Sequence, residues 1–200
     1  MKQNKNVKIA VTGGIGSGKS TVCRLIAGNG FPVYSCDEVY SELIDGNKLK
    51  NKLVEEFGAE ILSSGGKVDR RALSKIVFSN AEKLKKLNTI THGAVFEEIF
   101  ARANKDALAF FEVPVLFEGN YQGMFDEVIV VKRQLSSRIF SVMNRDKLSE
   151  EQVSERVNRQ YNYDNSDFAQ YYVIHNDGNF DDLKISVNDL MLKIVKKYEQ

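Results

Sequence analysis

The chain has 200 residues, 42% hydrophobic and 28% charged, which is typical of one globular domain and excludes a disordered or collagen-like protein. Its 28 Lys and Arg residues nearly balance its 27 Asp and Glu residues, so the net charge of +1 provides no bulk field for nucleic acid or a membrane surface. Two cysteines, Cys23 and Cys36, supply neither a disulfide framework nor a zinc site. No secretory signal and no apolar stretch near the ~20 residues of a membrane span are found, which predicts a cytoplasmic protein.

Short β-branched and aromatic runs alternate with stretches of helical periodicity. Residues 7–12 form the first such run, and a glycine loop and a helical pattern over residues 20–27 follow it. Further strands are predicted at residues 31–35, 108–116, 127–132 and 171–175. Alternating strands and helices imply right-handed crossovers, so we predict an α/β fold with a parallel five-stranded sheet flanked by helices.

Two intervals are too long to be simple crossovers. Residues 45–106 carry helical patterns without a strong strand signal, which predicts a helical insert between the second and third strands. Residues 133–167 are polar and rich in arginine. We therefore expect a single domain that contains two inserts.

The clearest motif lies between the first strand and the first helix. Residues 13–20 match G-x-x-x-x-G-K-[ST], in the strand-to-helix context that makes this pattern meaningful. The glycines let backbone N–H groups curl toward phosphate oxygens at the positive end of the helix dipole. Lys19 would hold the β and γ phosphates, and the Ser20 hydroxyl would bind Mg²⁺. The predicted ATP-binding residues in the loop are Gly14, Ile15, Gly16, Ser17, Gly18, Lys19, Ser20 and Thr21.

A phosphate loop identifies a nucleotide but not a reaction, so a small-molecule kinase must be weighed against a GTP-dependent switch. The chain has no Asn-Lys-x-Asp base-reading motif, since residues 104–107 place the aspartate one position early. A helical insert that holds an acceptor and arginines that close over a phosphoryl group both suit a kinase. The sequence therefore favours the kinase.

Motifs spread along the chain carry a family resemblance. They are VTGGIGSGKSTV at the loop, Cys36-Asp37-Glu38, VDRRALSKIVF at residues 68–78, His92, VPVLFE at residues 113–118, residues 134–145, RVNRQ at residues 156–160 and VIHNDG at residues 173–178. In order and approximate spacing, this set resembles the dephospho-CoA kinase family over nearly the whole chain.

The resemblance implies a P-loop NTPase-type fold and a reaction in which ATP, with Mg²⁺, phosphorylates the ribose 3′-hydroxyl of dephospho-CoA. It implies a nucleotide core of residues 1–44, 107–133 and 168–200, a CoA-binding insert of residues 45–106 and a lid of residues 134–167. Another small-molecule kinase, of the nucleoside or nucleotide type, is the alternative. The expected partners are the two substrates, without nucleic acid or membrane, and a monomer is favoured although the sequence leaves the oligomeric state open.

On the acceptor side, the resemblance assigns Asp37, Arg70, His92 and Glu118 to substrate binding and Asp37 to catalysis. Asp37 would accept the proton of the acceptor hydroxyl or hold a magnesium-bound water, although it could instead cap a helix. Arg70 would grip the pyrophosphate of the acceptor, or form a solvated helix-end charge. His92 could equally pack in a core, and Glu118 could simply end a strand.

Two positions depart from the family pattern. Ser35 stands where the family usually has a second aspartate, and Gly93 replaces the proline that usually follows the histidine. The first departure puts a mechanism with two carboxylates in doubt. The second removes a residue that fixes φ at a helix start, so we expect a different local turn.

On the ATP side, the resemblance assigns Lys19 and Arg145 to catalysis, and Arg145, Asn176 and Gly178 to ATP binding. Arg145 would clamp the phosphates, although a charged helix face is usually only solvated. Aromatic residues near the carboxyl end could stack on a base, yet their spacing is explained equally well by packing: Tyr161, Tyr163, Phe168, Tyr171 and Tyr172.

Overall fold

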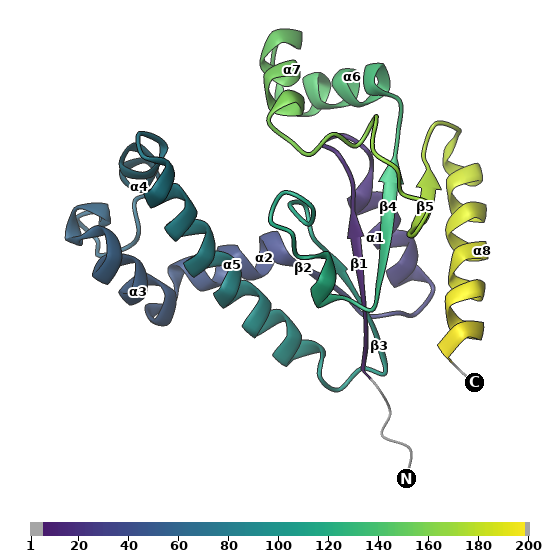
Figure 1. The fold of residues 1–200 in the computed structure, drawn as a ribbon, viewed down its shortest axis with the longest axis horizontal. Coiled ribbons are helices and arrows are strands. Elements are labelled where there is room, and N and C mark those ends of the chain that lie inside the picture. Colours follow the sequence, from purple (N-terminus) through teal and green to yellow (C-terminus); the bar gives the residue numbers. More distant parts are fainter. Residues whose placement is uncertain (1–5, 199–200) are drawn as a thin grey trace. The chain divides into compact units, whose positions relative to one another are not determined.

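The computed structural model describes residues 6–198, which divide into two compact units (Figure 1). The sheet unit comprises the described parts of Met1–Tyr34 and Lys105–Gln200, and the helical unit comprises Ser35–Asn104. The helical unit begins ten residues before the predicted insert at residue 45. The reason is that the intervening helix, α2 (Cys36–Asp45), packs on the other helices of this unit.

The sheet has five strands in the order β2-β3-β1-β4-β5, with bounds β1 (Val7–Thr12), β2 (Val33–Ser35), β3 (Leu108–Glu112), β4 (Glu127–Lys132) and β5 (Tyr172–His175). β1 pairs in parallel with β3 and β4, and β4 pairs in parallel with β5. Ile9 lies opposite Phe110, and Val130 lies opposite Val173. Nearly continuous apolar runs suit central strands covered on both faces. The predicted α/β fold is confirmed.

The third strand is shorter than predicted. The apolar run suggested residues 108–116, but β3 ends at Glu112 and a series of turns follows. Pro114 has no backbone N–H to donate to a neighbouring strand, so it favours an end to the pairing there. As a result, Glu112 stands at the carboxyl edge of the sheet instead of inside a strand.

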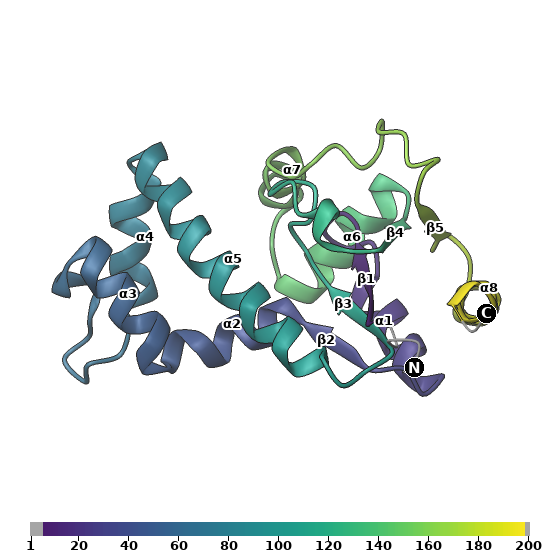
Figure 2. The same ribbon diagram turned by 60° about the horizontal axis from the view of Figure 1, so that its bottom comes forward.

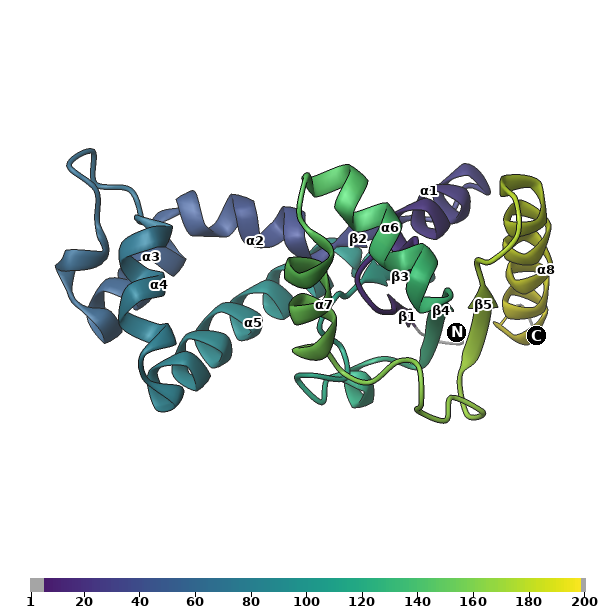
Figure 3. The same cartoon turned by 90° about the horizontal axis from the view of Figure 1, so that it is seen from above.

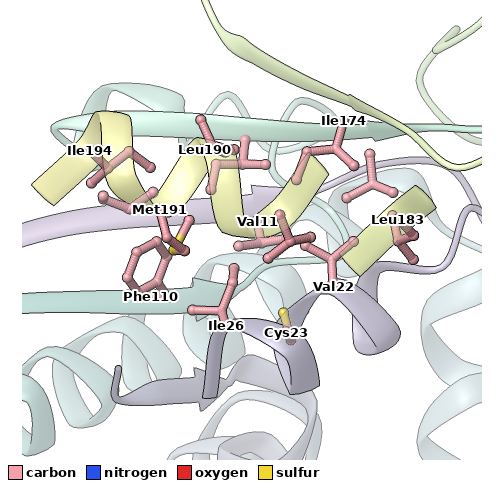
Figure 4. Packing of buried hydrophobic residues seen from close by; sticks show 14 of the residues in the cluster. Val11, Val22, Cys23, Ile26, Phe110, Ile174, Leu183, Leu190, Met191 and Ile194 are labelled. Atoms are coloured by element: carbon pink, nitrogen blue, oxygen red, sulfur yellow. The ribbon is translucent and has the colours of Figure 1, made fainter. Parts of the chain in front are cut away.

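Helices α1 (Lys19–Gly28) and α8 (Phe180–Tyr198) pack together against the sheet. Figure 4 shows their apolar side chains, among them Ile26, Leu183 and Ile194, interlocked with Val11 and Phe110 of the strands. This buried cluster anchors both ends of the phosphate-loop segment, because β1 enters it before the loop and α1 enters it after the loop.

Two further helices, α6 (Leu135–Asp146) and α7 (Glu150–Asn158), follow β4 and pack on each other beyond its carboxyl end (Figure 3). The turn between them places Lys147 in the left-handed region, with a φ of 57°, and a capping box then begins α7 at Ser149 and Gln152. These helices make up most of the predicted lid, residues 134–167. A short 3-10 helix, η2 (Gln122–Met124), precedes β4.

The helical unit contains α2, α3 (Asn47–Phe57), the 3-10 helix η1 (Ala59–Ile61), α4 (Arg70–Phe78) and α5 (Ala81–Ala103), seen in Figure 2. Polar side chains begin three of the helices: Ser35 caps α2, Asp69 caps α4 and Asn80 caps α5. The unit has its own apolar core, formed by Ile44, Leu49, Leu53, Phe57, Ile61, Leu73 and Val77.

Within residues 6–198, no helix is both long and apolar enough to cross a membrane. Neither Cys23 nor Cys36 is part of a disulfide, and burial raises the pKa of the Cys23 thiol.

Candidate functional site

The loop between β1 and α1 has the backbone geometry that phosphate binding requires. Gly18 has a φ of 96° and serves as the residue before α1, a left-handed conformation that a side chain would strain. Its carbonyl accepts the N–H groups of Thr21 and Val22, which are the first hydrogen bonds of the helix. The backbone N–H groups before Thr21 therefore have no acceptor within the helix, and they lie at the positive end of its dipole.

Lys19 reaches back over this loop. Its Nζ donates to the carbonyl oxygens of Gly13 at 2.7 Å and Gly14 at 3.1 Å. These bonds hold the ammonium group beside the same stretch of backbone whose amides would bind phosphate. The structure thus places a cation where the motif predicts one.

Ser20 contacts a carboxylate that sequence reasoning missed. Its Oγ donates to Oε1 of Glu112 at 2.7 Å, across the boundary between α1 and the end of β3. Glu112 was overlooked because the predicted strand ran through it. A signal was present, since a single carboxylate in an otherwise apolar strand often marks the strand's functional end.

Asn176 lies beside the loop, after β5. Its Nδ2 donates to the Ser17 carbonyl at 2.8 Å and sits so close to Gly18 that a side chain there would collide with it. Gly178 is confined in a similar way, because a Cβ would lie 2.7 Å from a carboxylate oxygen of Asp182. The structure therefore brings Asn176 to the loop, and Gly178 follows at the turn into α8.

Helix α6 packs directly against the loop. Arg138, whose side chain is 3% exposed, presses its guanidinium against Gly14, so any side chain at Gly14 would clash with it. Arg138 Nη2 donates to Oδ2 of Asp164 at 2.6 Å. A solvated charged face was the alternative that the sequence left open for the arginines of this helix. It does not hold for Arg138, which with Val142 is buried where α6 meets the loop.

The segment after α7 holds the loop from another direction, and sequence reasoning missed two of its residues. The Gln160 Oε1 atom accepts the backbone N–H of Ile15 at 2.7 Å, and the buried Tyr163 hydroxyl lies 3.1 Å from Thr12 Oγ1. Burial raises the pKa of Tyr163, so its hydroxyl stays protonated. The sequence signals were the RVNRQ motif, which contains Gln160, and the aromatic run, which contains Tyr163.

Glu118 contacts the segment after α7 from the turns that follow β3. Its Oε1 accepts the backbone N–H of Tyr161 at 3.0 Å, and the carboxylate is exposed. The rings of the segment pack around Phe117, with centroids 5.0 to 6.0 Å from it: Tyr161, Tyr163, Phe168 and Tyr171. Four of the five aromatic residues weighed as base-stacking candidates thus pack on one another, the alternative that the sequence left open.

Arg145 lies further along α6 and is not brought to the loop. Its guanidinium makes a two-pronged contact with the adjacent Asp146, at 2.7 and 3.1 Å, and Arg156 joins the same carboxylate at 3.3 Å. Hydrogen bonding to Asp146 raises the pKa of Arg145 and keeps it charged. The Arg145 side chain is 64% exposed, so it remains accessible to a ligand.

In the helical unit, Asp37 is exposed in the first turn of α2, and Ser35 caps that helix by accepting the Glu38 N–H at 3.3 Å. The interpretation of Asp37 as the helix cap is therefore wrong. Ser35, which stands in place of a family aspartate, has a structural function instead. Asp37 retains only the favourable interaction of a carboxylate with the helix dipole.

Arg70 and His92 occupy different helices of the same unit. Arg70 begins α4 and lies 5.5 Å from the centroid of the Tyr40 ring. His92 is half-buried in the middle of α5, and burial lowers its pKa, which favours the neutral ring at pH 7. α5 continues without a break through Gly93, the residue that replaces the family's proline.

The described part of the chain holds no cluster of three or more His, Cys, Asp or Glu side chains suited to a metal. Ser20 and Glu112 offer two adjacent oxygen donors instead. Mg²⁺ prefers oxygen ligands and usually binds through one or two protein groups, with waters and substrate phosphates completing its shell. The donor set at the loop therefore fits Mg²⁺.

Comparison with known proteins agrees with this geometry. Residues 7–182 match the protein family described as Dephospho-CoA kinase, a range that includes the loop and every predicted site residue. A dephospho-CoA kinase of Fusobacterium nucleatum is 34% identical over 177 residues, which are 88% of this chain and 92% of that relative.

Two solved structures extend the likeness to the fold. A Thermus thermophilus protein has a TM-score of 0.80 and 32% identity, over 94% of this chain and 97% of its own. A dephospho-CoA kinase from Campylobacter jejuni has a TM-score of 0.66 and 28% identity, over 95% of this chain and 98% of its own. The similarity thus covers both units.

Proposed function

The chain belongs to the dephospho-CoA kinase family, and from this membership we propose how its residues divide the work of phosphoryl transfer. The family's reaction transfers the γ-phosphate of ATP to the ribose 3′-hydroxyl of dephospho-CoA, giving CoA and ADP. The observation that carries the assignment to this chain is the match over residues 7–182, together with a phosphate loop already folded around Lys19.

On the ATP side, the loop amides and the amino-terminal end of α1 bind the phosphates, and Lys19 neutralises charge on the β and γ groups. Little covalent chemistry is left to the protein in phosphoryl transfer, so positioning and electrostatic stabilisation account for most of the catalysis. Asn176 and Gly178 border the adenine, which is consistent with the contact of Asn176 with Ser17. Arg145 closes on the phosphates from α6.

Mg²⁺ would be held by Ser20, with Glu112 orienting the Ser20 hydroxyl through their 2.7 Å hydrogen bond. When bound, the ion would neutralise charge that develops on the β and γ phosphates.

On the acceptor side, we assign Asp37 as the group that accepts the proton of the 3′-hydroxyl, because its exposed carboxylate has no capping function. Arg70 carries a charge suited to the acceptor pyrophosphate. His92 is neutral at pH 7 and would contribute a hydrogen bond. Glu118 would contact the acceptor while its other interaction holds Tyr161.

The reaction is tested by measuring coupled ADP release with ATP and a panel of acceptors. We expect turnover well above background with dephospho-CoA alone. Comparable turnover with nucleosides or nucleoside monophosphates would instead support the alternative, a nucleoside or nucleotide kinase.

Glu112→Gln tests the carboxylate beside Ser20. Glutamine can still accept the Ser20 hydroxyl, but it removes the charge that would favour a divalent cation. We expect the Mg²⁺ concentration for half-maximal rate to rise by roughly 10- to 100-fold, the usual effect of altering a group that orients a metal ligand. Glu127→Gln is the matched control, since Glu127 also accepts a hydroxyl, that of Tyr198 at 2.6 Å, at the start of β4. An unchanged Mg²⁺ dependence in Glu112→Gln would exclude it from the metal site.

Arg145→Ala tests the exposed arginine of α6. Because its ion pair with Asp146 is largely solvated, we expect the melting temperature of the nucleotide-free protein to change by no more than a few degrees. Turnover should fall by at least about 10-fold if the guanidinium stabilises charge in the transition state. Arg159→Ala, which removes a similarly exposed partner of Glu155, should alter neither quantity. A large thermal loss with unchanged kinetics would identify Arg145 as a structural residue.

A further inference from the structure

Arg138 is the most deeply buried charged side chain among residues 6–198, and it lies against the phosphate loop. Its Nη1 atom lies against Gly14, and its Nη2 atom is bound to Asp164 at 2.6 Å. Its Nε is buried and has no hydrogen-bond partner. Taking a guanidinium out of water in this way is costly, and one carboxylate that is 39% exposed offsets only part of the cost.

The loop also contacts the backbone of Arg138 and the side chain of Val142, one turn further along α6. A Cβ at Gly16 would lie 2.7 Å from the Arg138 carbonyl oxygen and 2.9 Å from Val142 Cγ2. One turn of α6 therefore touches the loop at two glycines. A side chain at Gly16 would displace the backbone of α6, and a side chain at Gly14 would displace the buried guanidinium of Arg138, so the loop and this turn fit closely together.

Asp164 ties this contact to a second part of the chain. It lies one residue after Tyr163, whose hydroxyl meets Thr12, and four residues after Gln160, whose carboxamide holds the Ile15 N–H. Asp164 thus belongs to a segment that contacts the loop on either side of Gly14. The ion pair between Arg138 and Asp164 therefore joins that segment to α6 next to the loop.

We propose that Arg138 and Asp164 form a clamp that holds the phosphate loop in its phosphate-binding shape, so that Arg138 is a positioning residue for the nucleotide. It acts through Gly14 and need not touch the phosphates itself. Stability alone does not account for the pair, since apolar side chains of similar size often replace a buried ion pair without loss. The inference rests on the proposed phosphate site and goes beyond it in assigning a determinant of ATP affinity.

The primary test is Arg138→Met, which keeps a long, unbranched side chain but removes the guanidinium that contacts Gly14 and Asp164. We expect ATP to bind at least ~10-fold more weakly by calorimetry, since small displacements of positioning groups have effects of this size or larger. Inorganic tripolyphosphate should lose the same factor, and KM for dephospho-CoA should stay within about two-fold. Lys197→Met removes the cation of another ion pair in the sheet unit, with Glu127 at the start of β4; it is the matched control and should change none of these values.

Unchanged ATP affinity, or equal losses for both substrates, would overturn the clamp. Failure of the unmodified protein to bind ATP would instead contradict the proposed function, so the two results are distinct. If Arg138→Met does not fold, Asp164→Asn tests the clamp by whether ATP binding becomes weaker or tighter. Removing a negative charge near the loop should by itself tighten ATP binding, whereas loosening the clamp should weaken it, by about two- to five-fold. Tighter or unchanged binding in Asp164→Asn would refute the proposal.

Discussion

Lys19→Ala should lower kcat/KM by at least ~100-fold, the loss that follows removal of a preorganised electrostatic group from a transition state. The ammonium is already held at the loop by the carbonyls of Gly13 and Gly14, so it needs little rearrangement to meet phosphate charge. Because charge on the transferring group is greatest in the transition state, kcat should fall as well as ATP affinity. Coupled ADP release at saturating dephospho-CoA measures both.

Arg24→Ala provides the matched control. Arg24 is an exposed cation on the same helix, and its guanidinium donates to the Ser20 carbonyl and to Thr21 Oγ1. This variant should retain kcat/KM within about three-fold, since exposed charges away from the ligand have small effects. Near-normal activity in a folded Lys19→Ala protein would contradict the phosphate-loop interpretation.

Asp37→Asn should reduce kcat by about 10²- to 10⁴-fold and leave ATP affinity nearly unchanged, because a general base contributes a factor of this size. The amide keeps the size of the side chain but loses its charge and its proton-accepting oxygen. Since Ser35 caps α2, the substitution should also leave the melting temperature almost unchanged. Single-turnover rates and calorimetric ATP titrations provide the two measurements.

Glu38→Gln controls for the charge of the helix terminus. Glu38 is the next carboxylate in the same turn and is likewise exposed, so it interacts with the same helix dipole. Its substitution should leave kcat unchanged. If Asp37→Asn and Glu38→Gln prove equally silent, Asp37 is not the base, and the family resemblance at this position reflects another role.

The architecture could be predicted from the sequence because its signals are local. A short β-branched and apolar run such as residues 127–132 is typical of a central strand, and the observed bounds of β4 are the same. The phosphate loop could be predicted equally well. Its backbone geometry requires the glycines and its ligand requires the charge of Lys19, and these residues are close together in the sequence. Where a run was interrupted by Pro114, the predicted strand was too long, because periodicity does not register a missing N–H.

Contacts between distant segments were decided only by the tertiary structure. Glu112 and Ser20, 92 positions apart in the chain, meet because β3 ends and α1 begins at the same edge of the sheet. Arg138 and Arg145 are seven residues apart on one helix, yet the first is buried and the second exposed, since the loop contacts α6 at Arg138 and Val142 and not at Arg145. Gln160 and Tyr163 gained their contacts with the loop in the same way, 145 and 151 positions from their partners. The sequence by itself determined which chemistry the chain carries, because a phosphate loop is a local motif. Which side chains hold that loop in place depended on long-range packing, which no local pattern encodes.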